Sequence, residues 1–188
     1  MQYCLQCGSD QVAHTIPPGD NRPRFVCASC GFIFYQNPRN VAGCILEWHG
    51  RILLCRRGIE PRYGKWTVPA GFMENGETTA EAAARESLEE ARAQALELKL
   101  HTLFSLPHIN QVYMIYRGEL AEGRHQVGEE TLETGLYEEG QIPWEELAFP
   151  VIGESLRLYF DDRRKGSFAV HTGDIVRLPD RKLEIRHH

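Results

Sequence analysis

Two pairs of closely spaced cysteines constrain the start of the chain more than any other feature. The pairs are Cys4-Leu5-Gln6-Cys7 and Cys27-Ala28-Ser29-Cys30, and a glycine follows each of them. This spacing is typical of a structural zinc site in which four thiolates surround the ion. The glycines suit tight turns that let backbone amides face the sulfur atoms. We therefore predict that Cys4, Cys7, Cys27 and Cys30 bind Zn²⁺, rather than forming two disulfides or a redox C-x-x-C motif.

The segment around these cysteines needs such an ion to fold. Residues 1–36 are rich in Cys, Gly and Pro and show no helical apolar period. A segment of fewer than about 40 residues rarely has enough apolar core to fold alone, whereas zinc contributes on the order of 10 kcal/mol to the folding of such modules. Arg22 and Arg24 are offset by Asp10 and Asp20, so no basic face for nucleic acid emerges. We expect a small scaffold or interface module.

The composition narrows the class of partner. The 188-residue chain has a formal net charge of −5, with 42% hydrophobic and 25% charged residues, which is typical of a globular protein. The negative charge disfavours broad binding to nucleic acid or anionic lipid. No apolar run is long enough to span a membrane, and the first residues lack the features of a signal peptide. We predict a cytoplasmic protein that does not bind membranes.

Beyond residue 36 the sequence pattern changes to strands. Residues 41–48 and 51–56 are apolar runs joined by His49-Gly50, a hairpin signal. Residues 100–106 and 111–120 predict two further strands. Cys44 and Cys55 lie inside the first two runs and are expected to be small buried hydrophobic residues.

Two helices complete the predicted domain. Thr78 and Glu81 have the spacing of a capping box, and the helix that they begin is expected to run to about Leu96. Residues 150–164 predict a second helix with an apolar stripe. Strands on both sides of a long helix indicate an α/β fold with a mixed sheet and helices packed against it.

The first helix carries a cluster of three carboxylates. Glu86, Glu89 and Glu90 fall within one turn, where they repel one another unless cations intervene. On the opposite side, a stripe of small and apolar residues predicts the packed face: Ala80, Ala84, Leu88, Ala91 and Ala95. On the helix alone, a solvated acidic surface is the favoured explanation of the carboxylates, ahead of a metal site.

The segment before the helix decides between these alternatives. Gly71, then Glu77 after five residues, then Arg85-Glu86-Ser87-Leu88-Glu89-Glu90 after seven more, resembles the Nudix box. The resemblance covers about residues 41–165, and the cysteine module resembles the N-terminal zinc ribbon of a Nudix subgroup that includes ADP-ribose and FAD pyrophosphatases. It implies a zinc ribbon at residues 1–36 and a Nudix α/β/α sandwich with a mixed sheet at residues 37–165. Residues 166–188 form a tail that stays unassigned.

The resemblance also implies roles for individual residues. Glu86, Glu89 and Glu90 are expected to bind Mg²⁺ or Mn²⁺, and Glu77 to support the metal and its waters. Arg85 is expected to orient the carboxylates by ion pairing. For the general base, Glu86 and the acidic loop with Glu129, Glu130 and Glu133 stay open as alternatives, because related enzymes take the base from either place.

Two positions depart from the Nudix pattern. Ser87 stands where an aliphatic residue is usual, and Arg92 replaces the glycine that follows the paired glutamates. Neither change removes a metal ligand. Because the missing glycine normally favours a left-handed terminator, we expect the helix to continue toward Leu96.

Candidate substrate-binding residues flank the box. Arg56 and Arg57 are candidates for contacts with phosphate or ribose, although a solvated hairpin end is an equal alternative. Trp66 and Phe72 are candidates for stacking on a base, although aromatic residues beside a strand more often belong to the core. Histidines such as His101 and His108 have no metal-ligand spacing and receive no role.

The expected activity is hydrolysis of a pyrophosphate bond in a nucleoside diphosphate linked to another group, giving AMP and a phosphorylated product. NADH is disfavoured, because residues 106–111 lack the run typical of zinc-ribbon NADH pyrophosphatases. Pro107 lies at about the distance beyond the box that is associated with ADP-ribose hydrolases, and together with the ribbon it favours ADP-ribose or FAD. The alternatives are an NADH or nucleoside triphosphate pyrophosphatase and a non-catalytic ADP-ribose sensor, and the intact carboxylates speak against the sensor. An RNA-decapping enzyme is disfavoured by the neutral ribbon. A homodimer is compatible with the apolar content.

Overall fold

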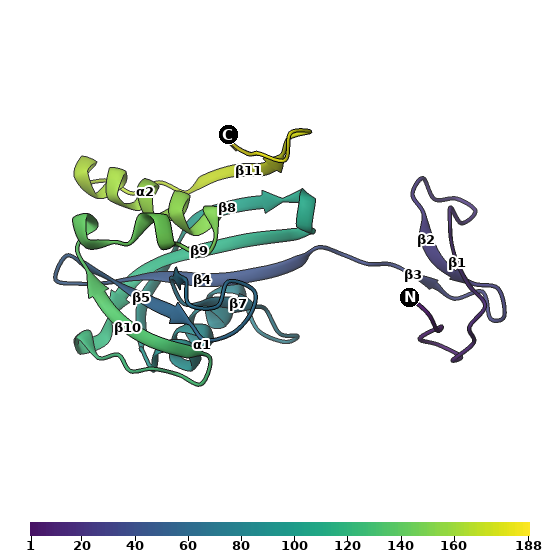
Figure 1. Cartoon of the computed structure of the whole chain (residues 1–188), viewed down its shortest axis with the longest axis horizontal. Helices are drawn as coiled ribbons and strands as arrows, with labels where there is room; N and C mark the ends of the chain where they lie inside the picture. The colour runs from purple at the N-terminus through teal and green to yellow at the C-terminus, as the bar shows by residue number, and fades with distance from the viewer. The chain divides into compact units, whose positions relative to one another are not determined.

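The computed structural model describes all 188 residues and divides the chain into two compact units, Met1–Asn37 and Pro38–His188 (Figure 1). The first unit is a three-stranded antiparallel sheet of β1 (Val12–Thr15), β2 (Arg24–Cys27) and β3 (Ile33–Phe34). Few of its side chains are buried, and two of those are Cys4 and Cys27. The cysteine cluster therefore takes the place of an apolar core.

The second unit contains a nine-stranded sheet and two helices. Its strands are β4 (Arg39–Trp48), β5 (Arg51–Arg57), β6 (Trp66–Thr67), β7 (Ala70–Phe72), β8 (Ala95–Leu106), β9 (Gln111–Leu120), β10 (Thr131–Tyr137), β11 (His171–Arg177) and β12 (Leu183–His187). Its helices are α1 (Thr79–Ala91) and α2 (Pro150–Lys165), with 3₁₀ turns η1 (Pro107–Ile109), η2 (Ala121–Gly123), η3 (Glu139–Gln141) and η4 (Trp144–Glu146). Neither α-helix has both the length and the apolar character needed to cross a membrane.

The sheet is mixed, and β4 is central to it. The strand order is β10-β5-β4-β9-β8-β11-β12, with β6 paired to β5 and β7 paired to β4. β4 runs parallel to β9 along most of its length and antiparallel to β5 at the hairpin end. At its other end it pairs with β7, which leads toward α1. This pairing brings β7 and the start of α1 close to the first residues of β4.

Alternation along β4 separates two layers of core. Val41 and Ile45 pack in one cluster with residues of α2, whereas Ala42, Cys44 and Leu46 pack in a second cluster with residues of α1. Successive side chains of a strand point to opposite faces, so the two helices cover opposite faces of the sheet. The predicted α/β/α sandwich is confirmed.

The hairpin between β4 and β5 forms as predicted. His49 and Gly50 both have positive φ, at 47° and 82°, and Trp48 pairs with Arg51 across them. Two-residue turns of this kind match the twist of antiparallel strands. Cys44 and Cys55 are both buried, as the apolar runs indicated.

Helix α1 begins as predicted but ends earlier. The capping box of Thr78 and Glu81 is formed in full. The expectation that the helix continues to Leu96 is wrong, because Arg92 adopts the left-handed conformation with φ of 49°. Its N–H bonds the carbonyl of Leu88, and the N–H of the following residue bonds that of Ser87. Arg92 thus makes the terminating turn that a glycine usually makes, and β8 begins at Ala95.

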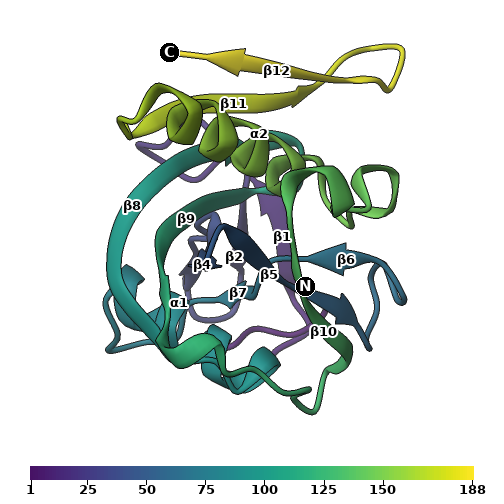
Figure 2. The same cartoon turned by 90° about the vertical axis from the view of Figure 1, so that its left-hand side faces the viewer.

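The tail after α2 extends the sheet, although its sequence pattern did not place it. β11 pairs in parallel with β8, and β12 pairs antiparallel with β11 as the edge strand. Figure 2 shows the two strands side by side beyond β8. Gly173 permits this pairing, because a Cβ there would lie 2.3 Å from the carbonyl oxygen of Arg186. The carboxyl end of β11 lies at the cavity described below.

Candidate functional site

Part of the carboxylate-bearing side of α1 faces the protein interior. Glu86 is 8% exposed and Ser87 is fully buried, whereas Leu88 is 53% exposed. The predicted faces of the helix are therefore wrong at Leu88 and Glu86, whereas Ala91 of the predicted stripe is buried and Glu89 is exposed, as expected. Alanines on the inward side, including Ala82 and Ala83, let the helix approach the sheet closely. Glu86 is consequently held against the strands rather than in open solvent.

Gly71 makes room for the Glu86 carboxylate. A Cβ on Gly71 would lie 2.3 Å from Oε1 and 2.5 Å from Oε2 of Glu86, closer than any non-bonded contact allows. Gly71 lies in β7 and pairs with Ala42 of β4. The box glycine is required here for a close side-chain approach, since its φ is not among the positive values of the chain.

Glu90 occupies a second position on the same side of α1. Its Oε2 accepts a hydrogen bond of 3.2 Å from the backbone N–H of Ala70. Burial raises the pKa of Glu90 to about 8, and burial also raises the pKa of Glu86. Two neighbouring desolvated carboxylates destabilise each other as anions unless cations balance them. Their oxygen ligands suit a hard divalent cation, so the residues fit the ion that the box implies.

Arg85 joins four of the acidic and polar groups around this site. Its Nε and Nη2 each donate to the Glu77 carboxylate at 2.9 Å. Its Nη1 donates to Glu86 at 2.8 Å and to Glu89 at 3.0 Å, and Nη2 also donates to the Phe72 carbonyl at 3.1 Å. The guanidinium lowers the pKa of Glu77 to about 2. Glu77 therefore stays anionic, and Arg85 fixes the loop to the helix.

The loop before β10 packs against the end of α1 and adds acidic groups. The N–H of Gly128 bonds the Glu90 carbonyl at 3.0 Å, and a Cβ on Gly128 would lie 1.8 Å from the Glu89 carbonyl oxygen. Only glycine allows this approach. As a result, Glu129 and Glu130 line the same cavity as the carboxylates of α1, and the charge of Glu130 contributes to the raised pKa of both Glu86 and Glu90.

These groups line a cavity of about 960 Å³, which is within the usual range for small-molecule sites. Its acidic wall holds Glu86, Glu89, Glu90, Glu129 and Glu130. Basic side chains also line it, namely Arg39, Arg57, Arg62, Arg85, Arg92 and Arg177. The cavity therefore presents cations and carboxylates to the same ligand.

Aromatic and apolar side chains form the remaining surface. Arg39 lies over the Phe72 ring at 4.6 Å, and Arg57 lies over the Phe149 ring at 5.2 Å. Tyr113 is 7% exposed, and burial raises the pKa of its hydroxyl. Such stacked cation and ring pairs hold the guanidinium groups in place. A planar ring and an anionic group can bind side by side on this surface.

Not every predicted site residue reaches the cavity. Arg57 and Phe72 line it, but Arg56, Trp66 and Glu133 do not. Trp66 is buried in the core on the α2 side and packs edge to face on Tyr137. Arg56 and Glu133 form an ion pair of 3.6 Å with each side chain about half exposed. Since adjacent residues of a strand point to opposite faces, Arg56 and Arg57 cannot both face the cavity.

Sequence reasoning missed several residues that line the cavity. Arg39 and Tyr113 come from β4 and β9, and Ile175, Arg177 and Leu183 come from the C-terminal strand pair. His108 also lines the cavity, and its Nδ1 lies 3.1 Å from the Ile175 carbonyl oxygen. None of these residues is close to the box in sequence. The pairing of β11 with β8 places the C-terminal residues at the site, and the pairing of β4 with β7 and β9 places Arg39 and Tyr113 there.

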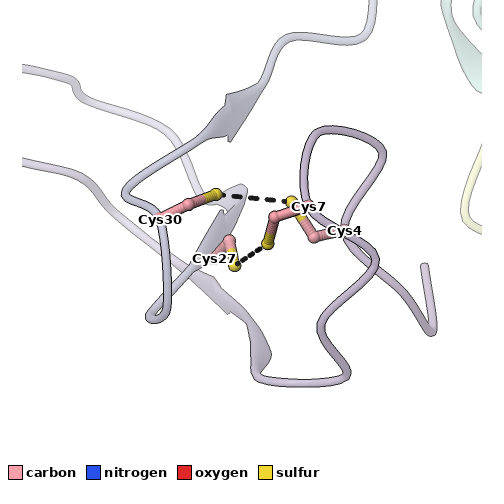
Figure 3. Close-up of side chains that lie close together, drawn as sticks. All are labelled: Cys4, Cys7, Cys27 and Cys30. Carbon is pink, nitrogen blue, oxygen red and sulfur yellow. Dashed lines mark hydrogen bonds between the residues drawn. The ribbon is translucent and has the colours of Figure 1, made fainter.

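The four cysteines of the first unit form a compact cluster (Figure 3). The sulfur atoms of Cys4 and Cys30 lie 3.7 Å apart, as do those of Cys7 and Cys27, and all four lie within 4.8 Å of one another. None is in a disulfide. Tetrahedral Zn²⁺ with Zn–S bonds of ~2.3 Å separates its sulfur ligands by about 3.8 Å.

Backbone groups prepare this cluster for thiolates. The N–H groups of Cys30 and Ser29 lower the pKa of the Cys27 thiol, whereas the neighbouring cysteine sulfurs raise the pKa of the Cys30 thiol. Gly8 and Gly31 both have φ of 74°, and each bonds back to the carbonyl of the cysteine four residues earlier. The observed geometry fits a structural zinc ion held by four thiolates.

Comparison with protein families gives two matches. The family described as "Nudix N-terminal", a zinc ribbon, matches residues 2–36, and the NUDIX domain family matches residues 36–161. Among solved structures, a NUDIX hydrolase from Nitrosomonas europaea has a TM-score of 0.89 and 48% sequence identity, covering 94% of this chain and 99% of its own. An ADP-ribose pyrophosphatase from Streptococcus suis, at 18% identity and a TM-score of 0.59, covers 72% of this chain and 99% of its own and shows the fold alone.

Curated relatives also match the chain. The NAD-capped RNA hydrolase NudC of Edwardsiella ictaluri is 34% identical over 125 residues, which are 65% of this chain and 45% of the relative. The protein of the same description from Salmonella heidelberg is 28% identical over 145 residues, or 76% of this chain and 53% of the relative. The chain thus spans about half the length of the curated relatives that it matches.

Proposed function

The chain belongs to the Nudix family and carries the family's N-terminal zinc ribbon, and from this premise we propose that it is a metal-dependent pyrophosphatase. Its substrate is a nucleoside diphosphate joined to a second group, and its products are a nucleoside monophosphate and a phosphorylated fragment. The observation that carries this proposal is the cavity in which carboxylates of α1 face arginines and aromatic rings. The arginines are suited to bind an anionic pyrophosphate, and the carboxylates are suited to bind a divalent ion.

Glu86, Glu89 and Glu90 would hold Mg²⁺ or Mn²⁺, and the four cysteines of the ribbon would hold Zn²⁺. When bound, the divalent ion neutralises phosphate charge and lowers the pKa of a coordinated water. Arg85 keeps Glu86 and Glu89 oriented through its hydrogen bonds, and Glu77 anchors Arg85. Gly71 keeps the space in which the Glu86 carboxylate sits.

The general base is a carboxylate that lines the cavity. Glu86, Glu129 and Glu130 meet this condition, and Glu133 does not, because it pairs with Arg56 outside the cavity. A base must lie within hydrogen-bonding reach of the attacking water. We therefore place the base on Glu86 or on the loop carboxylates Glu129 and Glu130. The proton from the attacking water passes to this group as the bridging P–O bond breaks.

The basic and aromatic side of the cavity would bind the rest of the substrate. Arg39 and Arg57, fixed over Phe72 and Phe149, are suited to contact the diphosphate while the exposed face of Phe72 stacks on a ring. The separation of these arginines from the stacking face of Phe72 favours a substrate with a planar base on one side of the diphosphate. ADP-ribose and FAD have this form, and ADP-ribose is our first choice.

A dinucleotide of the NAD type is the second candidate. It is favoured by the curated relatives, whose descriptions name NAD-capped RNA as their substrate. The same diphosphate contacts serve either substrate. ADP-ribose and an NAD-type dinucleotide differ in whether the cavity must also accommodate a nicotinamide ring beyond the ribose.

Product analysis separates these substrates. Wild type and Glu90→Gln are incubated with ADP-ribose, FAD, NADH and nucleoside triphosphates, in buffer with Mg²⁺, Mn²⁺ or neither. We expect wild type to release AMP from ADP-ribose or FAD only with a divalent ion, and the variant to release far less. Preferential cleavage of NADH would move the assignment to the second candidate. Tight ADP-ribose binding with no cleavage of any compound would overturn hydrolysis in favour of a sensor.

A further inference from the structure

A second group of metal-ligating side chains lies on the α2 side of the sheet. His101 of β8, Asp162 of α2 and His171 of β11 bring ligand atoms within 4.8 Å of one another. None of the three lines the nucleotide cavity. The proposed hydrolysis therefore gives them no role.

A β-bulge aims His101 into this group. The register of β8 against β9 shifts between Leu100 and Thr102, which places both His101 and Thr102 against α2. His101 Nε2 lies 3.3 Å from the Ser155 carbonyl oxygen, and Thr102 Oγ1 lies 2.8 Å from the Ser155 hydroxyl. Bulges re-aim side chains in this way, often near functional sites. His101 is fully buried as a result.

The hydrogen bond of His101 determines which ring nitrogen is free. The carbonyl of Ser155 can only accept, so Nε2 carries the hydrogen of a neutral imidazole. The lone pair then belongs to Nδ1. Nδ1 is the buried side-chain polar atom that has no hydrogen-bond partner in this protein. A buried acceptor without a partner destabilises the fold unless another group binds it.

Asp162 and His171 are partly explained by their own contact. The Asp162 carboxylate accepts from His171 Nε2 at 2.7 Å and from the Ala169 N–H at 3.1 Å. Asp162 is 3% exposed, and this pair ties β11 to α2. The pair does not explain why a third ligand, His101, stands beside it with a free lone pair. The rings of His101 and His171 are 5.3 Å apart at their centroids.

We propose that His101, Asp162 and His171 form a second transition-metal site, separate from the ribbon and from the carboxylates of α1. Two imidazoles and one carboxylate suit a borderline divalent ion such as Zn²⁺, with water in the fourth position. The ligands are His101 Nδ1, the Asp162 carboxylate and His171 Nε2. On binding, His171 Nε2 releases the proton that it shares with Asp162.

The surroundings of this site support an ion. The Ser155 carbonyl accepts a hydrogen bond from Nε2 of His101, an arrangement that is common for histidines that bind a metal through their other nitrogen. The rings of Tyr159 and Phe168 pack around His101 and limit access of water. The partly exposed His171 leaves an entry path. Because the three ligands come from β8, α2 and β11, the ion would anchor the strand that carries Ile175 and Arg177 into the cavity.

Calorimetric titration with Zn²⁺ tests this site. The full chain, with its ribbon already loaded with zinc, is titrated in saturating Mg²⁺ so that the carboxylates of α1 are occupied. We expect one further equivalent of Zn²⁺ to bind wild type. His101→Gln and His171→Gln should each lose that equivalent or bind it at least tenfold more weakly. Glu90→Gln and His125→Gln, which leave the three ligands intact, should retain it.

The outcomes that overturn the proposal are distinct. No further equivalent in wild type, or an undiminished one in His171→Gln, rules the site out. Loss of the equivalent in Glu90→Gln alone assigns the ion to the carboxylates of α1 instead. Thermal unfolding in zinc-free buffer checks that each variant is folded, and His171→Gln decides the result if the more buried His101→Gln does not fold.

Discussion

The guanidinium of Arg85 holds the carboxylate of Glu77 through two nitrogen atoms, Nε and Nη2, each at a distance of 2.9 Å. The same guanidinium reaches Glu86 and Glu89 through Nη1. One side chain therefore connects the loop that follows β7 to two of the carboxylates on α1. This arrangement depends on the planar, forked shape of arginine, which lysine lacks.

Arg85→Lys should weaken the divalent metal site while keeping its charge. A single ammonium group cannot bond Glu77 on two sides and hold Glu86 and Glu89 as well. We expect the apparent affinity for Mg²⁺ to fall by about 10–100-fold, with part of the rate recovered at high Mg²⁺. Initial rates against Mg²⁺ concentration measure this effect. Arg124→Lys, at an exposed position, is the matched control, and equal affinities in the two variants would contradict the positioning role.

Glu90→Gln should lower turnover on the order of a hundredfold or more, because it removes an anionic metal ligand from an enclosed position. Gln is similar in size and can still accept the Ala70 N–H, so the fold should persist. Steady-state rates at saturating substrate provide the measurement. Glu97→Gln, on an exposed side chain, should leave the rate unchanged. A near-normal rate for Glu90→Gln would remove Glu90 from the site.

Stability without divalent ions should depend on pH through Glu90. Burial raises its folded-state pKa to about 8 from 4.5. A raised pKa stabilises the fold most at pH values below the unfolded-state pKa, and this contribution is lost as pH rises through the folded-state value. Between about pH 5 and pH 8, wild type should therefore lose stability relative to Glu90→Gln, on the order of a few kcal/mol.

Urea unfolding of both proteins at several pH values, without added Mg²⁺, measures this difference. Addition of Mg²⁺ at the upper end should restore wild type but not the variant, since only wild type keeps the full set of carboxylates. A difference that stays constant with pH would show that Glu90 titrates normally.

The end of α1 gives opposite predictions at two positions. Ser87 is fully buried, and its hydroxyl faces the carbonyls of Ala84 and Ala93, so Ser87→Ala should cost about 1–3 kcal/mol of unfolding free energy. Arg92 has a left-handed backbone, so Arg92→Gly should stabilise the fold by about 0.5–1 kcal/mol. Chemical unfolding checks both values. A destabilised Arg92→Gly would mean that its side-chain contacts outweigh the backbone preference.

Loss of the ribbon zinc should affect one unit only. Cys7→Ser removes one of four ligands, and the first unit has few other buried side chains. We expect zinc content to fall and amide hydrogen exchange to rise across residues 1–37. Exchange in residues 38–188 should stay unchanged, because that unit has its own two core clusters. Cys55→Ser, outside the ribbon, is the control for zinc content.

Local chemistry explains the predictions that succeeded. The capping box at Thr78 and the His49-Gly50 turn depend on residues a few positions apart, so their spacing was sufficient. The same holds for the cysteine pairs, whose spacing matches the cluster that forms. The zinc itself stays a prediction that metal analysis can test.

The prediction of which face of α1 packs was wrong at Leu88 and Glu86 because of a contact with a neighbouring strand. Residue type alone assigned Leu88 to the core and Glu86 to the surface. In the fold, the absence of a Cβ on Gly71 leaves space for the Glu86 carboxylate, and Glu86 is buried while Leu88 is exposed. A missing Cβ on a neighbouring strand carries no periodic signal in the sequence of the helix.

Residues joined by distant pairing could not be predicted. His101 has no metal-ligand spacing to another histidine, yet strand pairing sets His171 opposite Thr102, the residue next to it. Trp66 lies near the box in sequence, and Glu133 lies in the acidic loop from which some related enzymes take the base. Strand alternation directs both side chains away from the cavity. Such positions follow from the order of strands in the sheet, which the sequence did not specify.

The C-terminal strand pair separates substrate selectivity from bond cleavage, two properties that often change together in enzymes. Ile175, Arg177 and Leu183 shape the ligand cavity, whereas the proposed metal-binding carboxylates and Arg85 all belong to the box and its helix. Mutations in the last strands can therefore alter which compounds enter without touching the groups proposed for bond cleavage. Directed evolution of selectivity in this protein would have its clearest target in these two strands, of which β12 is the edge of the sheet.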